Sequence, residues 1–299
     1  MKKGIAIVTC AVSMALYCGG IASAGPAAEI ESREEQGGEM SDGAQTGEAV
    51  PAEDEILIRM VGDDLIHQPI FSQSLLGDGG YDFDRIFEPM KEDFASADVA
   101  ILNQETILIK DYSQVSSYPM FGSPDALGHA IAKAGFDVVA HATNHTMDKG
   151  VTGILDTIGF WETNYPEMVY LGIHKDAADS DIRYMDVKGV RLGFVNYNYG
   201  LNGLEGRRRG REYLVDLLGD GGIEGTLHEA RDNSDFLIAI LHAGNEYVHT
   251  PTAYQRKQIQ RFIDNGADIV FCAHPHVLEP YQMLTTPSGH TGLVYYSLG

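Results

Sequence analysis

The stretch ILIRMVGDDLIH, residues 56–67, decides the expected fold class. Apolar side chains fill residues 56–62 almost without interruption, which is typical of a strand buried on both faces of a parallel sheet. Asp63 follows directly, and His67 comes four residues later. In open α/β sheets, functional side chains gather just beyond the carboxyl ends of the strands. The stretch therefore predicts a first strand that delivers polar groups to one edge of a sheet.

Strands and helices alternate through the rest of the chain. This alternation predicts an α/β fold with a largely parallel central sheet and antiparallel additions. The expected helices are residues 84–96, 124–134 (begun by Ser123-Pro124 and ended by Gly135), 151–163 and 251–265 (ended by Gly266). The other expected strands are residues 98–102, 136–140, 235–241, 267–272 and 293–296, with a hairpin over 184–195 that turns at Lys188-Gly189.

Residues 1–24 have the pattern of a secretory signal peptide. Two lysines precede an apolar stretch, and Ala22-Ser23-Ala24 supplies small residues at the usual cleavage spacing. An uncleaved membrane anchor is disfavoured by the glycine pair at 19–20, and a lipidation site at Cys18 is disfavoured by the preceding Tyr17. We therefore expect an exported protein that is extracellular or associated with the cell envelope.

The segment 25–55 is strongly acidic and has few large apolar residues, so we expect a disordered linker. The whole chain has 43 acidic and 21 basic residues and a formal net charge of −22. This balance argues against a nucleic-acid partner, because binding to phosphates needs Lys and Arg. Cys272 is the one cysteine beyond the predicted signal peptide, which excludes an intramolecular disulfide in the mature chain.

Polar side chains follow five of the expected strands at the point where each strand ends. They are Asp63, His67, Asn103, Glu105, Asn144, His145, Asp148, His242, Glu246, His274 and His276. Each residue alone has an ordinary explanation as a surface group, a cap or a turn. Imidazoles and carboxylates gathered at one sheet edge, without a surplus of Lys or Arg, form the donor set of a divalent-metal site. A buried polar network without metal is the main alternative.

Two of these residues are catalytic candidates. A pair of metal ions a few ångströms apart activates water and stabilises the attacking and leaving oxygens of a displacement. His145 is then a candidate general acid that protonates the leaving oxygen, and Asp148 is the second catalytic candidate. The alternative for His145 is that it only orients a metal ligand.

The ordered motifs resemble one known family, the CapA-type poly-γ-glutamate capsule synthesis proteins. The matching segments are Val61–His67 (GDxxxH), Asn103–Glu105 (NxE), Thr143–Gly150 (NNHxxDxG), His242–Tyr247 (HWGxEY, with Pro251 and Gln255 beyond it), Ala273–Val277 (GxHPHV) and Tyr296–Gly299 (YSLGNF). They run in family order from residue 56 to the last residue.

The resemblance implies a four-layer α/β/β/α sandwich of the metallophosphatase type with a dinuclear site. It implies as metal ligands Asp63, His67, Glu105, Asn144, His242, His274 and His276, with Glu105 or Asp63 bridging the ions. Asn103 and Glu246 would be near neighbours, and His145 the acid or an orienting residue. The cofactors would be two divalent ions, with Mn, Fe and Zn all compatible with mixed N and O ligands.

The chain departs from the family pattern at three positions. Thr143 replaces the first Asn of NNHxxDxG, Ala243 replaces the Trp of HWGxEY, and Ala273 stands where the family often has His. None of these changes removes an expected ligand. The sequence also stops at Gly299 inside a motif, so we treat residues 56–299 as a domain that is possibly truncated.

Two hypotheses for the function follow. The first is an exported metal-dependent hydrolase of poly-γ-glutamate capsule biosynthesis or surface-polymer processing, acting on an anionic polymer or a phosphoester. The second is a non-catalytic transport or anchoring component that binds polymer and membrane-bound capsule synthesis proteins. The one dense basic run, Arg207-Arg208-Arg209 with Arg211, could hold an anionic polymer, although a solvated loop is the favoured interpretation.

Overall fold

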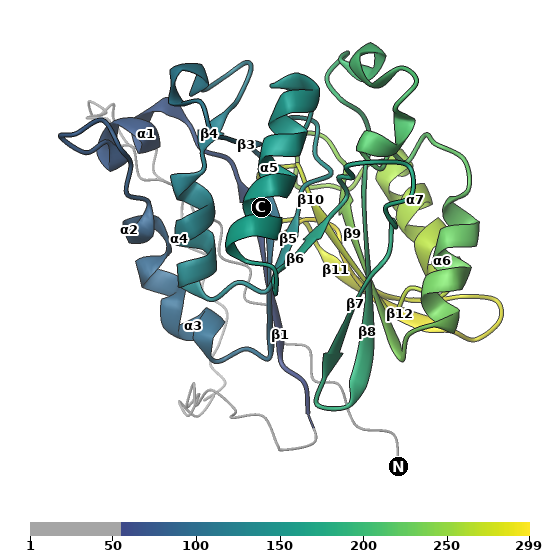
Figure 1. Ribbon diagram of the computed structural model, residues 1–299. Helices are drawn as coiled ribbons and strands as arrows, with labels where there is room; N and C mark the ends of the chain where they lie inside the picture. Colours follow the sequence, from purple (N-terminus) through teal and green to yellow (C-terminus); the bar gives the residue numbers. More distant parts are fainter. Residues whose placement is uncertain (1–54) are drawn as a thin grey trace, which may run out of the picture.

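The computed structural model describes residues 55–299, so the predicted signal peptide and nearly all of the acidic linker lie outside the described residues. Within this range the strands form a four-stranded sheet, a six-stranded sheet and a small two-stranded ribbon (Figure 1). No helix in residues 55–299 combines the length and apolar character that a membrane crossing requires.

The four-stranded sheet is parallel throughout. Its strands, in spatial order, are β1 (Ile58–Asp64), β2 (Val99–Gln104), β5 (Val138–Ala140) and β6 (Val169–Leu171). The register between β1 and β2 shifts between Val61 and Asp63. This irregularity lies immediately before the carboxyl end of β1, where the candidate site begins.

The six-stranded sheet has a parallel centre and antiparallel edges. In spatial order its strands are β11 (Tyr281–Thr285), β12 (Thr291–Tyr295), β10 (Ile269–Ala273), β9 (Phe236–His242), β8 (Val190–Asn198) and β7 (Arg183–Val187). The pairs β7–β8 and β11–β12 are antiparallel, and the other pairs are parallel. The ribbon joins β3 (Leu108–Ile109) to β4 (Ser123–Pro124).

Helices cover the outer faces of the two sheets (Figure 1). Those against the four-stranded sheet are α1 (Gln68–Ser74), α2 (Asp84–Phe87), α3 (Lys91–Ala95), α4 (Ala126–Ala134) and α5 (Gly150–Asn164). Those against the six-stranded sheet are α6 (Ile223–Asp232) and α7 (Ala253–Asp264). Short 3₁₀ turns lie at Glu88–Met90, Tyr112–Gln114, Glu205–Arg208 and Glu212–Leu214.

Alternation along β2 shows why four layers form. Ala100 and Leu102 belong to the apolar cluster under the helices, whereas Val99 and Ile101 belong to the cluster between the two sheets. All four are almost completely buried. Successive side chains of a strand point to opposite faces, so a strand that is apolar at every position needs a packed layer on each side. The expected α/β/β/α architecture is confirmed.

Several expected elements differ from the structure. The single helix expected over 84–96 is wrong: α2 ends at Phe87, and a 3₁₀ turn containing Pro89 separates it from α3. Proline lacks the N–H that a continuous helix needs at that position. The prediction that Ser123-Pro124 begins a helix is also wrong, since these residues form β4 and α4 starts at Ala126.

The expected hairpin is confirmed, including its turn. Lys188 has a φ of 49° and Gly189 a φ of 77°, which are the left-handed conformations that a tight two-residue hairpin turn requires. The sequence analysis missed α1, α6 and the short strands β3, β4, β6 and β11. The first three of these strands have two or three residues each, too few to show a period.

Gly62 is a position where only glycine fits. A Cβ atom built there would lie 1.9 Å from the backbone oxygen of Gly299, and the amide of the next residue, Asp63, donates a hydrogen bond to the same oxygen at 2.8 Å. The residues 298–299 therefore pack directly on the backbone of β1, beside the first candidate ligand.

We predict that Gly62→Ala lowers the free energy of unfolding by about 1–3 kcal/mol, because two backbone segments must move apart. Urea denaturation followed by circular dichroism measures the change. Gly77→Ala is the matched control, since a Cβ at Gly77 meets nothing within 4 Å and the change is expected to be neutral. Equal midpoints for the two variants would contradict the prediction.

Candidate metal centre

Strand ends from both sheets bring histidine and carboxylate side chains together. Asp63 lies near the end of β1, Glu105 follows β2, His242 ends β9, and His274 and His276 follow β10. Three overlapping groups have ligand atoms within 4.8 Å of one another: Glu105, His242 and His274; Asp63, Glu105 and His276; Glu246, His274 and His276. We call Asp63, Glu105, Asn144, His242, His274 and His276 the candidate centre.

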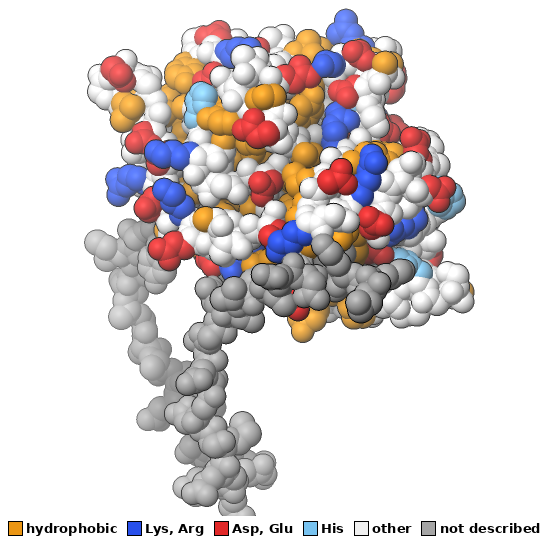
Figure 2. All heavy atoms as spheres, turned by 60° about the horizontal axis from the view of Figure 1, so that its bottom comes forward, with side chains coloured by type: hydrophobic (Ala, Val, Ile, Leu, Met, Phe, Trp, Pro, Cys, Tyr) orange, Lys and Arg blue, Asp and Glu red, His pale blue; other side chains and the backbone are white. Residues whose placement is uncertain are grey.

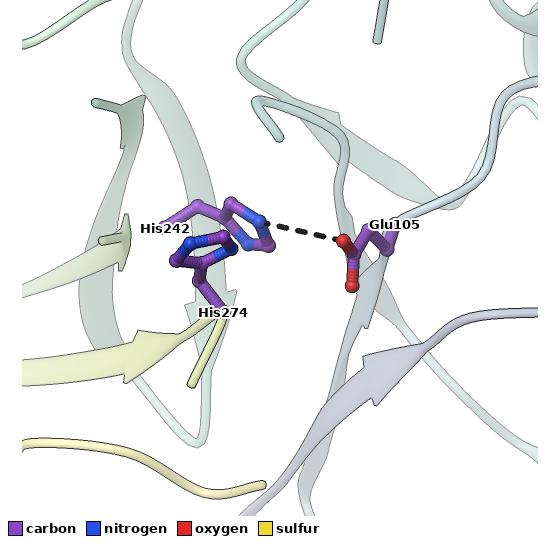
Figure 3. A group of neighbouring side chains, drawn as sticks. All are labelled: Glu105, His242 and His274. Atoms are coloured by element: carbon purple, nitrogen blue, oxygen red, sulfur yellow. Dashed lines mark ion pairs between the residues drawn. The ribbon is translucent and has the colours of Figure 1, made fainter. Parts of the chain in front are cut away.

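Glu105 takes part in two of the three groups. Its Oε1 lies 3.8 Å from Nε2 of His242, and its Oε2 lies 3.8 Å from Nδ1 of His276. Figure 3 shows the Glu105 carboxylate opposite the neighbouring rings of His242 and His274. Asp63 lies at the other side of the second group, with its Oδ2 3.0 Å from Nδ1 of His276. Glu105 is therefore the carboxylate that two of the groups share.

Hydrogen bonds fix the orientation of Asp63 and His242. The Asn103 side-chain amide donates to Asp63 Oδ1 at 2.7 Å and lies 3.2 Å from Nδ1 of His242. Nε2 of His242 lies 2.9 Å from Oδ1 of Asn144. With Asn103 donating to Nδ1, Nε2 is the ring nitrogen of His242 that faces Glu105 and Asn144. Asn103, expected as a near neighbour, thus contacts one candidate ligand from each sheet.

Unpartnered polar atoms test whether these residues suit a cation. Both carboxylate oxygens of Glu105 and Nδ1 of His274 are buried without a hydrogen-bond partner. The ion pairs that Asp63 and Glu105 make within residues 55–299 all involve histidine. Burial and then the charge of Asp63 raise the pKa of Glu105 well above its ordinary value. Buried charge without a partner is costly, so the donor set fits a divalent cation.

The histidines are mostly held in the neutral form. Burial and the neighbouring histidines lower the pKa of His242 well below its ordinary value. Burial lowers the pKa of His274 to about 4. His276 differs: burial lowers its pKa, but the hydrogen bond to Asp63 and the charges of Asp63 and Glu246 together outweigh burial, and the net change is upward. A neutral imidazole is the metal ligand, so His242 and His274 already have the charge state that binds metal at neutral pH.

The loop after β10 has an unusual backbone. His274 has a φ of 100° and His276 a φ of 54°, both in the left-handed region that non-glycine residues rarely occupy. Such conformations cost on the order of 1–3 kcal/mol each and persist where surrounding contacts enforce them. Here the amide of His274 donates to Oδ2 of Asp63 at 2.8 Å. The strained loop places the imidazoles of His274 and His276 together in the candidate centre.

His145 and Asp148 form a separate hydrogen-bonded pair. Nδ1 of His145 lies 2.7 Å from Oδ2 of Asp148, which also accepts from the amide of Phe121 at 2.6 Å. The Phe121 ring packs edge-on against the imidazole, with centroids 4.6 Å apart. Nε2 of His145 lies 3.9 Å from Glu105 Oε1. The pair therefore leaves Nε2 as the atom that faces the candidate centre.

Two predicted site residues lie at the rim. His67 is exposed and belongs to none of the three groups; its ring packs edge-on against Phe121 with centroids 5.0 Å apart. Burial, followed by the charges of His276 and His145, lowers its pKa. Because the Phe121 ring also packs against His145, His67 lies near that residue. Glu246, expected only as a neighbour, is exposed but has its carboxylate within reach of His274 and His276.

Sequence analysis missed two residues beside the centre. The Tyr199 ring lies against His274 with centroids 4.7 Å apart, and burial raises its pKa to about 12. Burial, helped by the charge of Asp63, raises the pKa of Asp64 to about 7. Tyr199 directly follows β8, which ends at Asn198 and not at residue 195 as expected. With the strand end placed correctly, the search for polar residues just beyond strand ends would have found Tyr199.

The arginine run is not uniformly a solvated loop. Arg208 is buried and makes a two-pronged ion pair with Asp220 at 2.8 and 2.7 Å, which corrects the expectation for this residue. Arg207 donates to the backbone oxygens of Met147 and Asp148 at 3.3 and 3.4 Å. It supports the turn that carries His145, while Arg209 and Arg211 are exposed.

We predict that Glu105→Gln stabilises the metal-free protein at neutral pH. Because the folded-state pKa of Glu105 is raised, its carboxyl lowers the free energy of unfolding as the pH rises above its ordinary value of 4.5. The free energy of unfolding of the variant should therefore be higher than that of the parent protein at pH 7, and the difference should shrink as the pH falls towards 4.5.

Urea denaturation in a chelator, at several pH values, measures this gap. Exposed Glu167→Gln is the control and should stay within about 0.5 kcal/mol of the parent protein. Adding Mn²⁺ should reverse the order, since the parent gains more from binding. A metal-free Glu105→Gln protein that is less stable at pH 7 would show that the carboxylate is already satisfied.

Comparison with known proteins places these motifs in a family. The sequence model of the family described as bacterial capsule synthesis protein PGA_cap matches residues 57–299. The PGA biosynthesis protein CapA of Bacillus subtilis (strain 168) is 28% identical over 226 residues, covering 72% of this chain and 56% of that protein. The capsule biosynthesis protein CapA of Bacillus anthracis is 27% identical over 196 residues, covering 64% of this chain and 46% of that protein.

This chain thus spans about half the length of the curated relatives it matches. Among solved structures, a hypothetical protein from Thermus thermophilus superposes with a TM-score of 0.47 and 15% identity, covering 81% of this chain and 75% of that one. The family model accounts for nearly every described residue, from the start of β1 to Gly299. The chain therefore belongs to the bacterial capsule synthesis protein family.

Proposed function

We propose that this protein is a hydrolase that uses two divalent metal ions in the production of a bacterial capsule polymer. The observation that carries the proposal is Glu105, whose two buried, unpartnered oxygens each face a different histidine. A carboxylate in that position bridges two ions in many dinuclear hydrolytic sites. Cell-envelope association and export are parts of the same proposal, supported by the relatives' names and by the signal-like residues 1–24.

Each ion would have its own set of ligands. Asp63, Glu105 and His276 would hold one ion, and Glu105, His242 and His274 would hold the other, with Asn144 beside His242. Such a pair supplies Lewis acidity, which polarises a phosphoryl or carbonyl oxygen and lowers the pKa of water. The oxygen and nitrogen donors suit Mn, Fe or Zn.

His145 is proposed to donate a proton to the leaving oxygen or nitrogen. Asp148 holds Nδ1 of the imidazole, so Nε2 is the atom left to carry the transferable proton. The amide of Phe121 in turn holds Asp148, which keeps the ring in one orientation. A binding protein has no need of an imidazole held in this way outside the ligand groups, which favours an enzyme over a transport or anchoring component.

The proposed substrate class is an anionic polymer of the poly-γ-glutamate type or a phosphoester linked to its production. One relative's name includes PGA biosynthesis, and the other's includes capsule biosynthesis. Metal ions would hold an anionic substrate in a protein of net negative charge. Figure 2, which views the face at the bottom of Figure 1, shows acidic and basic side chains mixed over that face, so it offers no continuous basic track for such a polymer.

We predict that the purified protein cleaves bis-p-nitrophenyl phosphate or poly-γ-glutamate only with added Mn²⁺ or a similar ion. His242→Ala and Glu105→Gln should lose at least about 100-fold in kcat/KM, because each removes a ligand. Exposed His228→Gln on α6 is the control and should retain full activity. Stoichiometric metal with no turnover on either substrate would reject the enzyme in favour of the transport or anchoring role.

We predict a different result for the proton donor. His145→Gln should lower kcat by about 10²–10⁴-fold while the bound metal stays unchanged. Steady-state kinetics and metal analysis of the purified variant measure these two quantities. Loss of metal from His145→Gln would instead mean that His145 helps to hold an ion.

A further inference from the structure

A second cluster of imidazole and carboxylates lies near the end of β6. His174 follows β6, Asp181 precedes β7, and Asp216 lies in the segment that leads from the 3₁₀ turn at Glu212–Leu214 towards α6. One ligand atom from each of these residues lies within 4.8 Å of the others. None of the three belongs to the candidate centre or to the family motifs.

Distances in this cluster suit a metal coordination shell. Nε2 of His174 lies 2.9 Å from Oδ2 of Asp216 and 3.8 Å from Oδ1 of Asp181. Two ligand atoms that each lie about 2.1 Å from one ion are about 3.0 Å apart when the ligand–metal–ligand angle is about 90°. They are about 3.8 Å apart when that angle is about 130°. Little movement is needed for all three groups to reach one ion.

The His174 ring is buried and incompletely satisfied. Its side chain is 2% exposed, and its Nδ1 has no hydrogen-bond partner. Nδ1 lies 3.8 Å from Oδ2 of Asp179, and Arg183 holds Asp179 by donating to Oδ1 at 2.9 Å. Metal-bound histidines usually donate their other ring N–H to a carboxylate. Asp179 is in place for that role.

Charge in the cluster is also unbalanced. Three aspartates, Asp179, Asp181 and Asp216, surround His174, and Arg183 pairs with one of them. Asp216 is buried, and its Oδ2 lies against the His174 ring. An added cation would relieve the cost of that buried carboxylate.

We propose that His174, Asp181 and Asp216 bind a third divalent transition-metal ion, with Asp179 orienting the imidazole. One imidazole and two carboxylates are donors that Mn²⁺ and Zn²⁺ accept. The rival explanation is a protonated His174 paired with Asp216 and no metal. This proposal uses residues outside the candidate centre, so it stands or fails independently of the proposed hydrolase.

Such an ion would stabilise the backbone that positions Tyr199 beside the candidate centre. It would tie the segment after β6 to Asp216, whose backbone oxygen accepts a hydrogen bond from the amide of Asn198 at 3.0 Å. Asn198 ends β8, and the next residue, Tyr199, packs on His274. The third ion is thus a structural ion, connected to a candidate ligand through Asn198 and Tyr199.

The test counts metal ions per chain. Chelator-treated protein is dialysed against Mn²⁺ or Zn²⁺, and bound metal is measured by inductively coupled plasma mass spectrometry and titration calorimetry. We expect the parent protein and the control Asp186→Asn, whose aspartate is exposed on β7, each to bind one ion more than Asp181→Asn. Asp179→Asn should keep the ion but bind it about 10–100-fold more weakly.

A second background separates the two metal proposals. Glu105→Gln combined with His242→Ala removes two residues of the candidate centre, and adding Asp181→Asn to this double variant should still remove one bound ion. Metal should raise the Tm of the double variant more than that of the triple variant. Equal metal content in the presence and absence of Asp181→Asn would overturn the third site and support the protonated His174, whatever the activity of the parent protein.

Discussion

The candidate centre depends on one carboxylate that connects the two sheets. Asp63 belongs to β1 of the four-stranded sheet, where Asn103 of the neighbouring β2 donates to its Oδ1. Its Oδ2 accepts from the amide of His274, which follows β10 of the six-stranded sheet. Because this one side chain is bonded to both sheets, the relative position of the two sheets and the spacing of the histidines are set together.

Electrostatics and packing oppose each other at this point. The sheets bury Glu105 completely among other acids and histidines, an arrangement that protein groups alone do not satisfy. A folded core normally avoids such a group, because an unpaired buried charge costs several kcal/mol, on the order of 3–5 when a partner is missing. The fold tolerates it where a ligand supplies the missing charge, which is common at functional sites.

Much of the fold followed from the sequence because the central strands are apolar at nearly every position. The residues at their carboxyl ends could then be found without coordinates, since parallel strands deliver their ends to one edge. The hydrogen bond between His145 and Asp148 could be seen only in the structure. The same holds for the short distance between the Glu246 carboxylate and the histidines 274 and 276, because both contacts depend on loop conformation. Arg208 was misjudged because a basic run gives no sign of an acidic partner twelve residues later.

The His174 cluster was missed for a related reason. His174 follows a three-residue strand that has no visible period, and Asp216 comes from a segment between two 3₁₀ turns and a helix. Single histidines and aspartates in loops carry no signal by themselves. Only the tertiary fold brings His174 beside Asp181 and Asp216, over a separation of 42 residues in the case of Asp216.

The contact between Gly299 and β1 also bears on how the molecule is assembled. The amide of Asp63, a candidate ligand, donates a hydrogen bond to the backbone oxygen of Gly299, which lies 299 − 63 = 236 positions further along the chain. A chain that has not yet been synthesised as far as Gly299 lacks that bond. Long-range closure of this kind is slow and comes late in folding. The backbone around Asp63 is therefore expected to reach its final arrangement only after the segment that contains Gly299 has been synthesised.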